Sequence, residues 1–324
     1  MTDFEFHIDN FMLHCTSKGL SEKTMKSYEQ ALQLFAIYMD QQYSITEVNH
    51  VMPNHIKNYI KHLKERGKYT VVASEQSKEH NFPQNRPDFN KKVSDTTIAN
   101  YLRNIKVFFN FLYKEHEIKN NPVKNIKNIK PTRKQKELLT KEEIKRILYE
   151  FDVTTFHGWR NRLIFKVILD TGVRIGECVS IKPEDLDLKF NTILLKNTKN
   201  KHERYVYFSD RLKQELKRWL LYRDRYSDSE WLFPTIRGTQ LDITAYQSAL
   251  KQAGDRANVK NVSPHVVRNT FAKYYLLNGG DLSTLSKILG HSSVEVTQRA
   301  YLDFTNDEIR RKYRKHSPLD HLKI

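Results

Sequence analysis

Two short motifs place arginines where they could bind a phosphate group. Residues 264–268 read Pro-His-Val-Val-Arg, so His265 and Arg268 are three residues apart and would share one face of a helix. They would lie in its first turn, where the partial positive charge of the helix end favours an anion. Arg174 follows a glycine at the end of an apolar stretch, and Glu177 could orient its guanidinium. Because a planar guanidinium fits two phosphate oxygens, these residues predict phosphate chemistry.

A histidine and a tyrosine near the C-terminus could complete such a site. The sequence Gly290-His291-Ser292 suits a helix that ends at its glycine and a next helix that a serine caps, which leaves the histidine unexplained. Tyr301 follows, but the chain has 17 tyrosines, so its position alone says little. A free tyrosine, with a pKa of about 10, needs cations or a base beside it to act as a nucleophile.

The first third of the chain is predicted to be helical. Ser21 would cap a helix, Ser94 would cap another with an apolar stripe from Ile98 to Leu112, and a shorter helix spans roughly 55–65. The stretch 66–93 is polar and contains two prolines, which predicts a long loop or insertion. These elements make up a predicted N-terminal domain over residues 1–118, with the insertion inside it.

A basic linker is predicted over residues 119–137. Pro122 and Pro131 bar a continuous helix there. The linker contains no acid up to residue 136, and seven cations could follow a phosphate backbone: Lys119, Lys124, Lys127, Lys130, Arg133, Lys134 and Lys136. The alternative is a solvated hinge without a partner.

A second domain is predicted over residues 138–324. Thr140 and Glu143 form a capping box, and an apolar run at 163–169 builds a buried helix. Residues 192–197 and 202–209 are rich in β-formers and predict a hairpin. Ser263 and Pro264 open a later helix, and short helices follow near 281–289 and 294–304. The fold class is therefore mainly α with a small antiparallel β-sheet, an α+β arrangement in the second domain.

Charge and cysteine content limit the classes of partner. The net charge is +17, from 55 Lys and Arg against 38 Asp and Glu, which favours a polyanion. No apolar run is long enough to span a membrane and the N-terminus lacks a signal pattern, so we expect a cytoplasmic, nucleoid-associated protein. Cys15 and Cys178 predict reduced thiols, and no His/Cys cluster has zinc spacing, so no metal is expected.

These motifs occur in an order that resembles the tyrosine recombinase (phage integrase) family, of the Xer-like or small-element type. The matching residues are Arg174 with Glu177, Lys199, His265 with Arg268, Leu289-Gly290-His291, and Tyr301. The resemblance implies that residues 1–118 form a SAM-like core-binding domain and that 138–324 form the catalytic domain.

The resemblance also implies a role for each matching residue. Arg174 and Arg268 would clamp the scissile phosphate, with Glu177 supporting Arg174. His265 would donate a hydrogen bond or act as a general base, and His291 would bind the phosphate. Tyr301 would attack, which gives a covalent 3′-phosphotyrosine.

A lysine in the segment 198–204 would protonate the departing 5′-oxygen. This segment resembles the family's G-K-x-x-K-x-R hairpin, with Thr198 in place of the glycine. Lys199 is the matching lysine, while Lys201 and Lys196 lie close to it in the sequence and compete for the role.

The implied reaction is site-specific cleavage and rejoining of double-stranded DNA through a Holliday junction, without ATP, metal or cofactor. The assembly would be a homotetramer on two DNA sites, or a heterotetramer with a paralogue. Two alternatives remain open: relaxation of DNA by a type IB topoisomerase, and a non-catalytic DNA-binding regulator that uses a helix-turn-helix around Gly290. Chromosome resolution, phage integration and movement of a mobile element are not distinguished.

Overall fold

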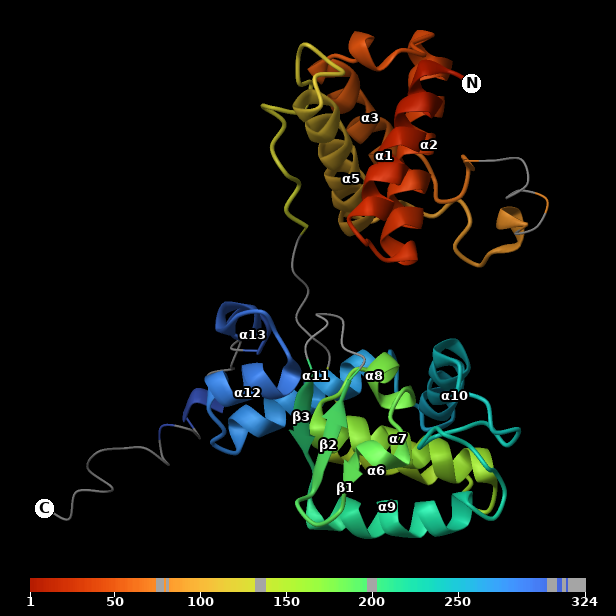
Figure 1. Cartoon of the computed structure of the whole chain (residues 1–324), viewed down its shortest axis with the longest axis vertical. Coiled ribbons are helices and arrows are strands. Elements are labelled where there is room, and N and C mark those ends of the chain that lie inside the picture. Colours follow the sequence, from red (N-terminus) through yellow and green to blue (C-terminus); the bar gives the residue numbers. More distant parts are fainter. Residues whose placement is uncertain are drawn as a thin grey trace, which may run out of the picture. The chain divides into compact units, whose positions relative to one another are not determined.

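The computed structural model describes residues 1–73, 79, 82–131, 138–196, 203–301, 308–310 and 313, without the side chains of 299–301. The chain divides into two compact units, Met1–Lys134 and Gln135–Ile324 (Figure 1). Helices dominate both units, and the second adds one small antiparallel sheet, so the predicted fold class is confirmed. No helix in the described ranges combines the length and apolar character that a membrane span needs.

Helices packed around an aromatic core form the N-terminal unit. They are α1 (Asp3–Ser17), α2 (Glu22–Tyr43), α3 (Pro53–Glu65) and α5 (Asp95–Lys114), with a 3-10 turn at Val48–His50. The predicted caps are confirmed, since the hydroxyls of Ser21 and Ser94 accept hydrogen bonds from the third residue beyond each. Phe35 and Phe108 are fully buried and pack edge-on against further aromatic rings of this core.

The described parts of the predicted insertion 66–93 form a loop whose two ends are joined. Gly67 pairs with Lys92 in an isolated antiparallel bridge. The ammonium of Lys68 lies 3.4 Å from a carboxylate oxygen of Asp88, and the loop includes a 3-10 turn at Pro83–Asn85. These contacts return the chain to the start of α5.

The start of the predicted linker packs against the N-terminal unit and is not an extended connection between the units. Val123 and Ile126 are buried in the N-terminal core, and the ammonium of Lys106 donates to the Ile126 carbonyl oxygen at 2.8 Å. The described part, 119–131, is therefore folded onto the N-terminal unit. It still exposes four of the predicted cations, namely Lys119, Lys124, Lys127 and Lys130. Arg133, Lys134 and Lys136 lie outside the described residues.

The C-terminal unit surrounds a three-stranded antiparallel sheet with helices. The strands are β1 (Leu186–Asp187), β2 (Thr192–Leu195) and β3 (Arg204–Tyr207), in the order β1-β2-β3. The helices are α6 (Lys141–Tyr149), α7 (Phe156–Thr171), α8 (Ile175–Val179), α9 (Asp210–Arg223), α10 (Ile243–Arg256), α11 (Pro264–Leu277), α12 (Leu282–Leu289) and α13 (Val294–Tyr301). The predicted hairpin is confirmed as β2 and β3, whereas β1 is too short to give a sequence pattern. Beyond α13, the described Glu308 pairs through its carboxylate with the ammonium of Lys273 at 2.8 Å.

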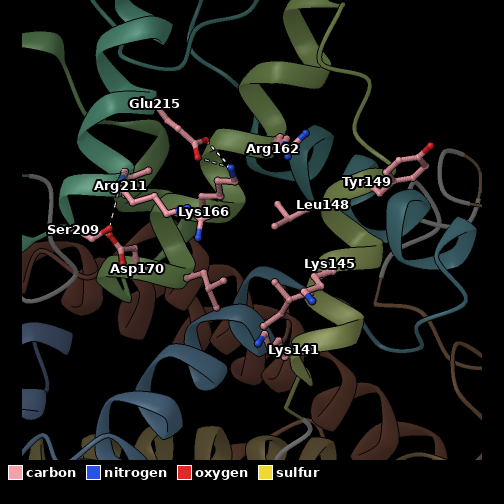
Figure 2. A pocket seen from close by; sticks show the side chains of 13 residues that line it. Lys141, Lys145, Leu148, Tyr149, Arg162, Lys166, Asp170, Ser209, Arg211 and Glu215 are labelled. Atoms are coloured by element: carbon pink, nitrogen blue, oxygen red, sulfur yellow. Dashed lines mark hydrogen bonds and ion pairs between the residues drawn. The ribbon is translucent and has the colours of Figure 1, made fainter.

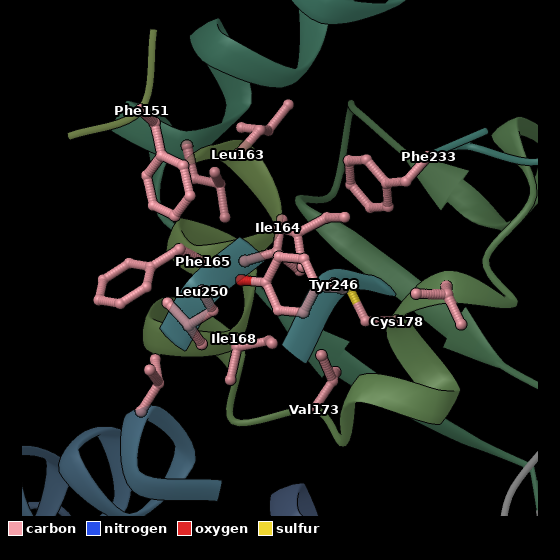
Figure 3. Close-up of a cluster of buried hydrophobic side chains, with 14 of the residues drawn as sticks. Phe151, Leu163, Ile164, Phe165, Ile168, Val173, Cys178, Phe233, Tyr246 and Leu250 are labelled. Atoms are coloured by element: carbon pink, nitrogen blue, oxygen red, sulfur yellow. The ribbon is translucent and has the colours of Figure 1, made fainter. Parts of the chain in front are cut away.

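Helix α7 runs through the core of this unit and fixes the turn that precedes Arg174. Figure 3 shows Tyr246 beside Ile164 of α7, with Cys178 next to the tyrosine ring. The helix ends at Gly172, which has φ +67° and supplies a left-handed cap. A Cβ there would lie 2.4 Å from the ring of Phe271, so close packing against α11 also requires glycine.

A hollow of about 480 Å³ lies on the C-terminal unit between α6, α7 and α9 (Figure 2). Its lining combines apolar residues such as Leu148 with cations that include Lys145 and Arg162. The ammonium of Lys166 on α7 meets the carboxylate of Glu215 on α9 at 2.6 Å and joins the two helices. None of the predicted site residues lines this hollow, so the candidate chemistry is located elsewhere.

Candidate active site

Arg174 is held at the start of α8 by Glu177. The Arg174 backbone N–H donates to Glu177 Oε2 at 2.9 Å, and its guanidinium Nη1 donates to Oε1 at 2.9 Å. The Glu177 side chain is 4% exposed, whereas that of Arg174 keeps 33% exposure. The predicted support of Arg174 by Glu177 therefore has a geometric basis, and the partly exposed guanidinium keeps donors that Glu177 does not engage.

A second arginine shares the same carboxylate. Arg204, the first residue of β3, donates from Nη1 to Glu177 Oε1 at 2.9 Å and from Nη2 to Oε2 at 2.8 Å. Burial alone would raise the pKa of Glu177, but the hydrogen bonds from Arg204 and from the Arg174 N–H outweigh it and hold that pKa below its usual range. Sequence reasoning gave Arg204 no role, although it ends the hairpin motif at 198–204.

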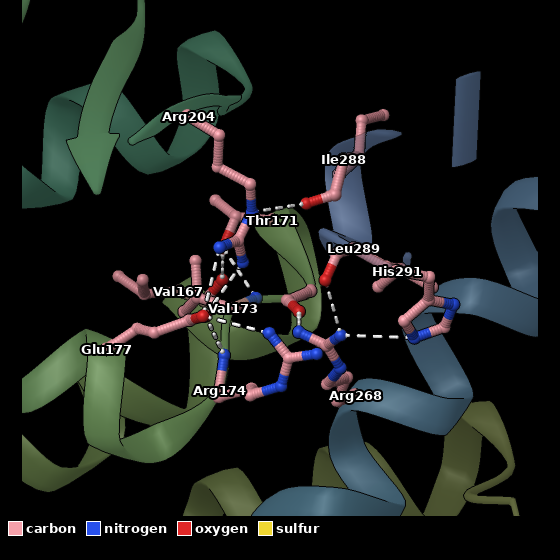
Figure 4. A network of polar contacts seen from close by, with 11 residues as sticks. Val167, Thr171, Val173, Arg174, Glu177, Arg204, Arg268, Ile288, Leu289 and His291 are labelled. Carbon is pink, nitrogen blue, oxygen red and sulfur yellow. Dashed lines mark hydrogen bonds and ion pairs between the residues drawn. The ribbon is translucent and has the colours of Figure 1, made fainter. Parts of the chain in front are cut away.

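Arg268 joins the turn before Arg174 to the end of α12. It lies on α11, is 3% exposed, and donates from Nη1 to the carbonyl oxygen of Gly172. Its Nη2 donates to the Leu289 carbonyl oxygen at 2.8 Å and lies 3.5 Å from His291 Nε2. Figure 4 shows Arg174, Arg268 and His291 within one polar network. The tertiary structure thus brings together three residues that are far apart in the sequence.

His291 is oriented from its other nitrogen by a threonine that sequence reasoning missed. Its Nδ1 lies 2.7 Å from the hydroxyl oxygen of Thr297, which is fully buried on α13. A threonine hydroxyl can donate or accept, so it can accommodate either tautomer of the ring. A hydroxyl donating to Nδ1 would leave a proton on Nε2, the nitrogen that faces Arg268.

Of the other predicted residues, the structure describes His265 fully, Tyr301 only by its backbone, and Lys199 not at all. His265 is exposed in the first turn of α11, three residues before Arg268, on the helix that Ser263 caps. Tyr301 is the last residue of α13, but its side chain lies outside the described part. Lys199 and its competitor Lys201 also fall outside the described residues.

Lys196, the third lysine considered, is described and is engaged elsewhere. It directly follows β2, and its ammonium lies 2.6 Å from a carboxylate oxygen of Asp185 and 3.7 Å from one of Glu184. These contacts raise its pKa, first through the hydrogen bond to Asp185. A lysine held in this way by two acids is poorly placed to donate a proton to a leaving group.

The network can bind an anion. Arg174 and Arg204 bind the Glu177 carboxylate, and Arg268 lies in the same polar network, so three guanidiniums stand against one carboxylate and the described charges sum to a positive site. Such preorganised donors stabilise charge that develops on a phosphate oxygen. Within the described ranges, no group of three or more His, Cys, Asp or Glu residues could hold a metal ion.

Comparison with known proteins agrees with this geometry. Residues 137–308 match the family described as Phage integrase family, which is more than half of the 324 residues. The chain belongs to the phage integrase family. Residues 8–78 of this integrase-family protein also match the Phage integrase, N-terminal SAM-like domain. The resemblance found in the sequence is therefore confirmed.

Two curated relatives of this integrase-family protein match it over almost its whole length. Tyrosine recombinase XerC of Oceanobacillus iheyensis is 26% identical over 326 residues, with 98% of each chain covered. Tyrosine recombinase XerD of Listeria innocua is 25% identical, with 96% of this chain and 98% of that protein covered.

Solved structures share the fold. The integrase of transposon Tn1549, in complex with a circular intermediate DNA, aligns with a TM-score of 0.73 at 18% identity, and covers 97% of this chain and 100% of that one. The XerH recombinase bound to a palindromic difH substrate aligns with a TM-score of 0.67 at 20% identity, and covers 92% and 80%.

Proposed function

We propose that this protein is a site-specific recombinase that cleaves and rejoins double-stranded DNA through a covalent phosphotyrosine. The observation that carries the proposal is the position of Arg268, which is bonded on one side to the turn before Arg174 and on the other to the segment that presents His291. Three residues of the family's motif order thereby share one cationic site. The relatives are named tyrosine recombinases, and the Tn1549 integrase and XerH bind DNA in their solved structures.

In the proposed reaction the phenol oxygen of Tyr301 attacks the scissile phosphorus. The bond from phosphorus to the 5′-oxygen breaks, which leaves a 3′-phosphotyrosine and a free 5′-hydroxyl. Arg174 and Arg268 hold the non-bridging oxygens, and His291 donates a hydrogen bond to the same phosphate. His265 would take the tyrosine proton as a general base, or donate a hydrogen bond.

The departing 5′-oxygen needs a proton, which we assign to Lys199. Lys201 remains the competitor, whereas the acid pairs of Lys196 weigh against it. Rejoining runs the same steps in reverse, with the 5′-hydroxyl of another strand as nucleophile. Bond energy is conserved in the covalent linkage, so the proposed mechanism draws on no ATP, metal or other cofactor.

The proposed substrate-bound form uses both units. Residues 1–118 would act as the core-binding domain and 138–324 as the catalytic domain, with the basic segment 119–137 following the phosphate backbone. Assembly would be a homotetramer on two sites, or a heterotetramer with a paralogue, passing through a Holliday junction. We expect it to act on DNA of the nucleoid, in the cytoplasm.

Covalent trapping tests the proposal even though the DNA site is not yet identified. A library of nicked duplexes with randomised sequence is incubated with the protein, and strands that remain protein-linked after denaturation are recovered and sequenced. The wild type should enrich one sequence class. Tyr301→Phe should abolish the adduct and retain DNA binding, while the matched control Tyr313→Phe, which alters an exposed tyrosine, should still form it. An adduct that persists in Tyr301→Phe would overturn the assignment of the nucleophile.

A second assay separates recombination from relaxation. A supercoiled plasmid that carries two copies of the recovered site should yield exchanged products when the wild type is added. Relaxation of the plasmid without exchange would instead indicate the chemistry of a type IB topoisomerase.

A further inference from the structure

Arg204 occupies a position where three structural elements meet. It begins β3, shortly after the segment 197–202, which lies outside the described residues, and its side chain is only 13% exposed. All three guanidinium nitrogens donate: Nη1 and Nη2 to Glu177, and Nε to the Ile288 carbonyl oxygen at 3.1 Å. One side chain therefore links the β-sheet, the start of α8 and the end of α12.

The first consequence concerns the charge of Glu177. Its buried carboxylate accepts from Arg174 and, through a two-bond fork, from Arg204. A fork of this kind is a strong and directional pair. With Arg204 present, one cation balances the carboxylate and Arg174 stays available to an anion. Without it, Arg174 would be the one guanidinium left on this buried carboxylate, which would then take up a proton more readily and hold Arg174 less firmly.

The second consequence concerns the turn between α12 and α13. Gly290 has φ +62°, and a Cβ there would lie 2.9 Å from Cζ of Arg204. The arginine therefore packs directly against the turn that leads to His291. The neighbouring carbonyl oxygens take different arginines, since Ile288 accepts from Arg204 and Leu289 from Arg268.

We infer that Arg204 is a positioning residue for DNA cleavage: by binding Glu177 and the end of α12 together, it fixes Arg174 relative to the turn before His291. The inference rests on the proposed function, because the residues positioned are the ones proposed to hold the phosphate. Arg204 itself has all three nitrogens engaged within the protein and does not contact the reacting atoms.

Arg204→Gln and Arg204→Lys test the inference on the nicked duplex recovered with the wild type. Arg204→Gln should slow single-turnover adduct formation about 10²-fold, the effect of a small misplacement of catalytic groups. Its Kd for the intact duplex should change less than about twofold, because the cations that face the phosphate backbone are unchanged. Arg204→Lys keeps the charge but has one nitrogen for three acceptors, so its rate should fall between those of the wild type and Arg204→Gln. Equal loss of binding and cleavage, or an unchanged rate, would overturn the inference.

The pH profile gives a readout that general destabilisation would not produce. The charged and titratable groups around Glu177 are Arg174, Arg204 and the buried thiol of Cys178. Loss of Arg204 removes the main group that offsets burial, so the pKa of Glu177 rises. Cleavage by Arg204→Gln should then fall as pH decreases through that raised pKa, over a range where the wild-type rate is flat. The double variant with Glu177→Gln should lack this acid limb. Its persistence in the double variant would contradict the inference.

A measurement without DNA checks the same link. All three tryptophans lie in the C-terminal unit, at positions 159, 219 and 231, so their fluorescence follows its unfolding. The stability deficit of Arg204→Gln should be small at low pH, grow as pH rises from the lowered pKa of Glu177 in the wild type to its raised pKa in the variant, and level off above that. The deficit should be independent of pH in a Glu177→Gln background. A deficit that is independent of pH in the native background would overturn the link to Glu177.

A substrate with a different leaving group distinguishes positioning by Arg204 from donation of a proton to the departing oxygen. The activity of the wild type in the same assay distinguishes failure of this inference from failure of the proposed function. A substrate with a 5′-thiolate leaving group needs no protonation, so it should leave the defect of Arg204→Gln unchanged. Rescue by this substrate would overturn the inference by placing the effect on the departing oxygen. An active wild type with normal Arg204→Gln refutes this inference alone, whereas a wild type that never forms an adduct refutes the proposed function and with it any role in cleavage.

Discussion

The hydroxyl of Thr297 lies 2.7 Å from Nδ1 of His291 and joins α13 to the turn that follows α12. Tyr301, the proposed nucleophile, comes four residues after Thr297 on the same helix, one turn further along the backbone. The histidine proposed to bind the phosphate and the helix that carries the tyrosine are therefore directly linked.

Removal of this hydroxyl should slow cleavage and leave the fold intact. Thr297→Val keeps the side-chain shape but allows the ring of His291 to rotate or to change tautomer. We expect adduct formation to slow about tenfold, equivalent to the loss of one hydrogen bond of roughly 1.4 kcal/mol. Thr297→Ser restores the hydroxyl and should recover most of the rate in the same trapping assay. Equal rates for the valine and serine variants would show that the hydrogen bond is unimportant.

Gly290→Ala should impair cleavage through Arg204. The added Cβ would meet that guanidinium at about 3.0 Å, at a residue with φ +62°. Gly19→Ala is a matched control, because Gly19 has φ +64° and open space around its Cβ position. Gly19→Ala should cost only the backbone strain of about 1 kcal/mol, measured by circular dichroism during denaturation. Gly290→Ala should cost more and slow adduct formation, and an effect equal to that of the control would exclude the contact with Arg204.

The stability of the C-terminal unit should depend on pH through Glu177. The folded pKa of this carboxyl is lower than its usual value of about 4.3, so its stabilising effect is present above that pH and is lost as pH falls through the folded pKa. Glu177→Gln should therefore reduce the free energy of unfolding by about 3 kcal/mol at neutral pH and by less near pH ~3. Tryptophan fluorescence in urea measures this, with the exposed Glu142→Gln as control. A difference between wild type and Glu177→Gln that stays constant with pH would contradict the prediction.

The exposed lysines at the start of the basic segment should contribute to DNA affinity in a salt-dependent way. Replacing Lys124 or Lys127 by Gln should lower the slope of log affinity against log salt by about 1 for each phosphate that the lysine no longer neutralises. Lys127→Arg keeps the charge and should keep the slope. If neither glutamine substitution changes the slope, these lysines do not contact phosphates and the segment is a solvated surface.

Sequence alone determined the helices with local signals and the order of the motifs. Ser21, Ser94 and Thr140 cap helices where expected, because a cap depends on residues within one turn. The motifs that we propose bind phosphate were equally visible, because each occupies only a few adjacent residues. The two-residue strand β1 was missed because its pairing with β2 is a tertiary contact with no repeat of its own.

Only the tertiary structure decided which residues hold the site together. Arg204 and Thr297 act on partners 27 and 6 residues away, at separations that no local periodicity encodes. The sequence also did not reveal that Val123 and Ile126 are buried in the N-terminal core. Their burial makes the start of the predicted linker part of the N-terminal unit. Spacing along a chain predicts contacts within a turn or a hairpin, whereas the enclosure of the Glu177 carboxylate by two arginines depends on how α8, β3 and α12 pack.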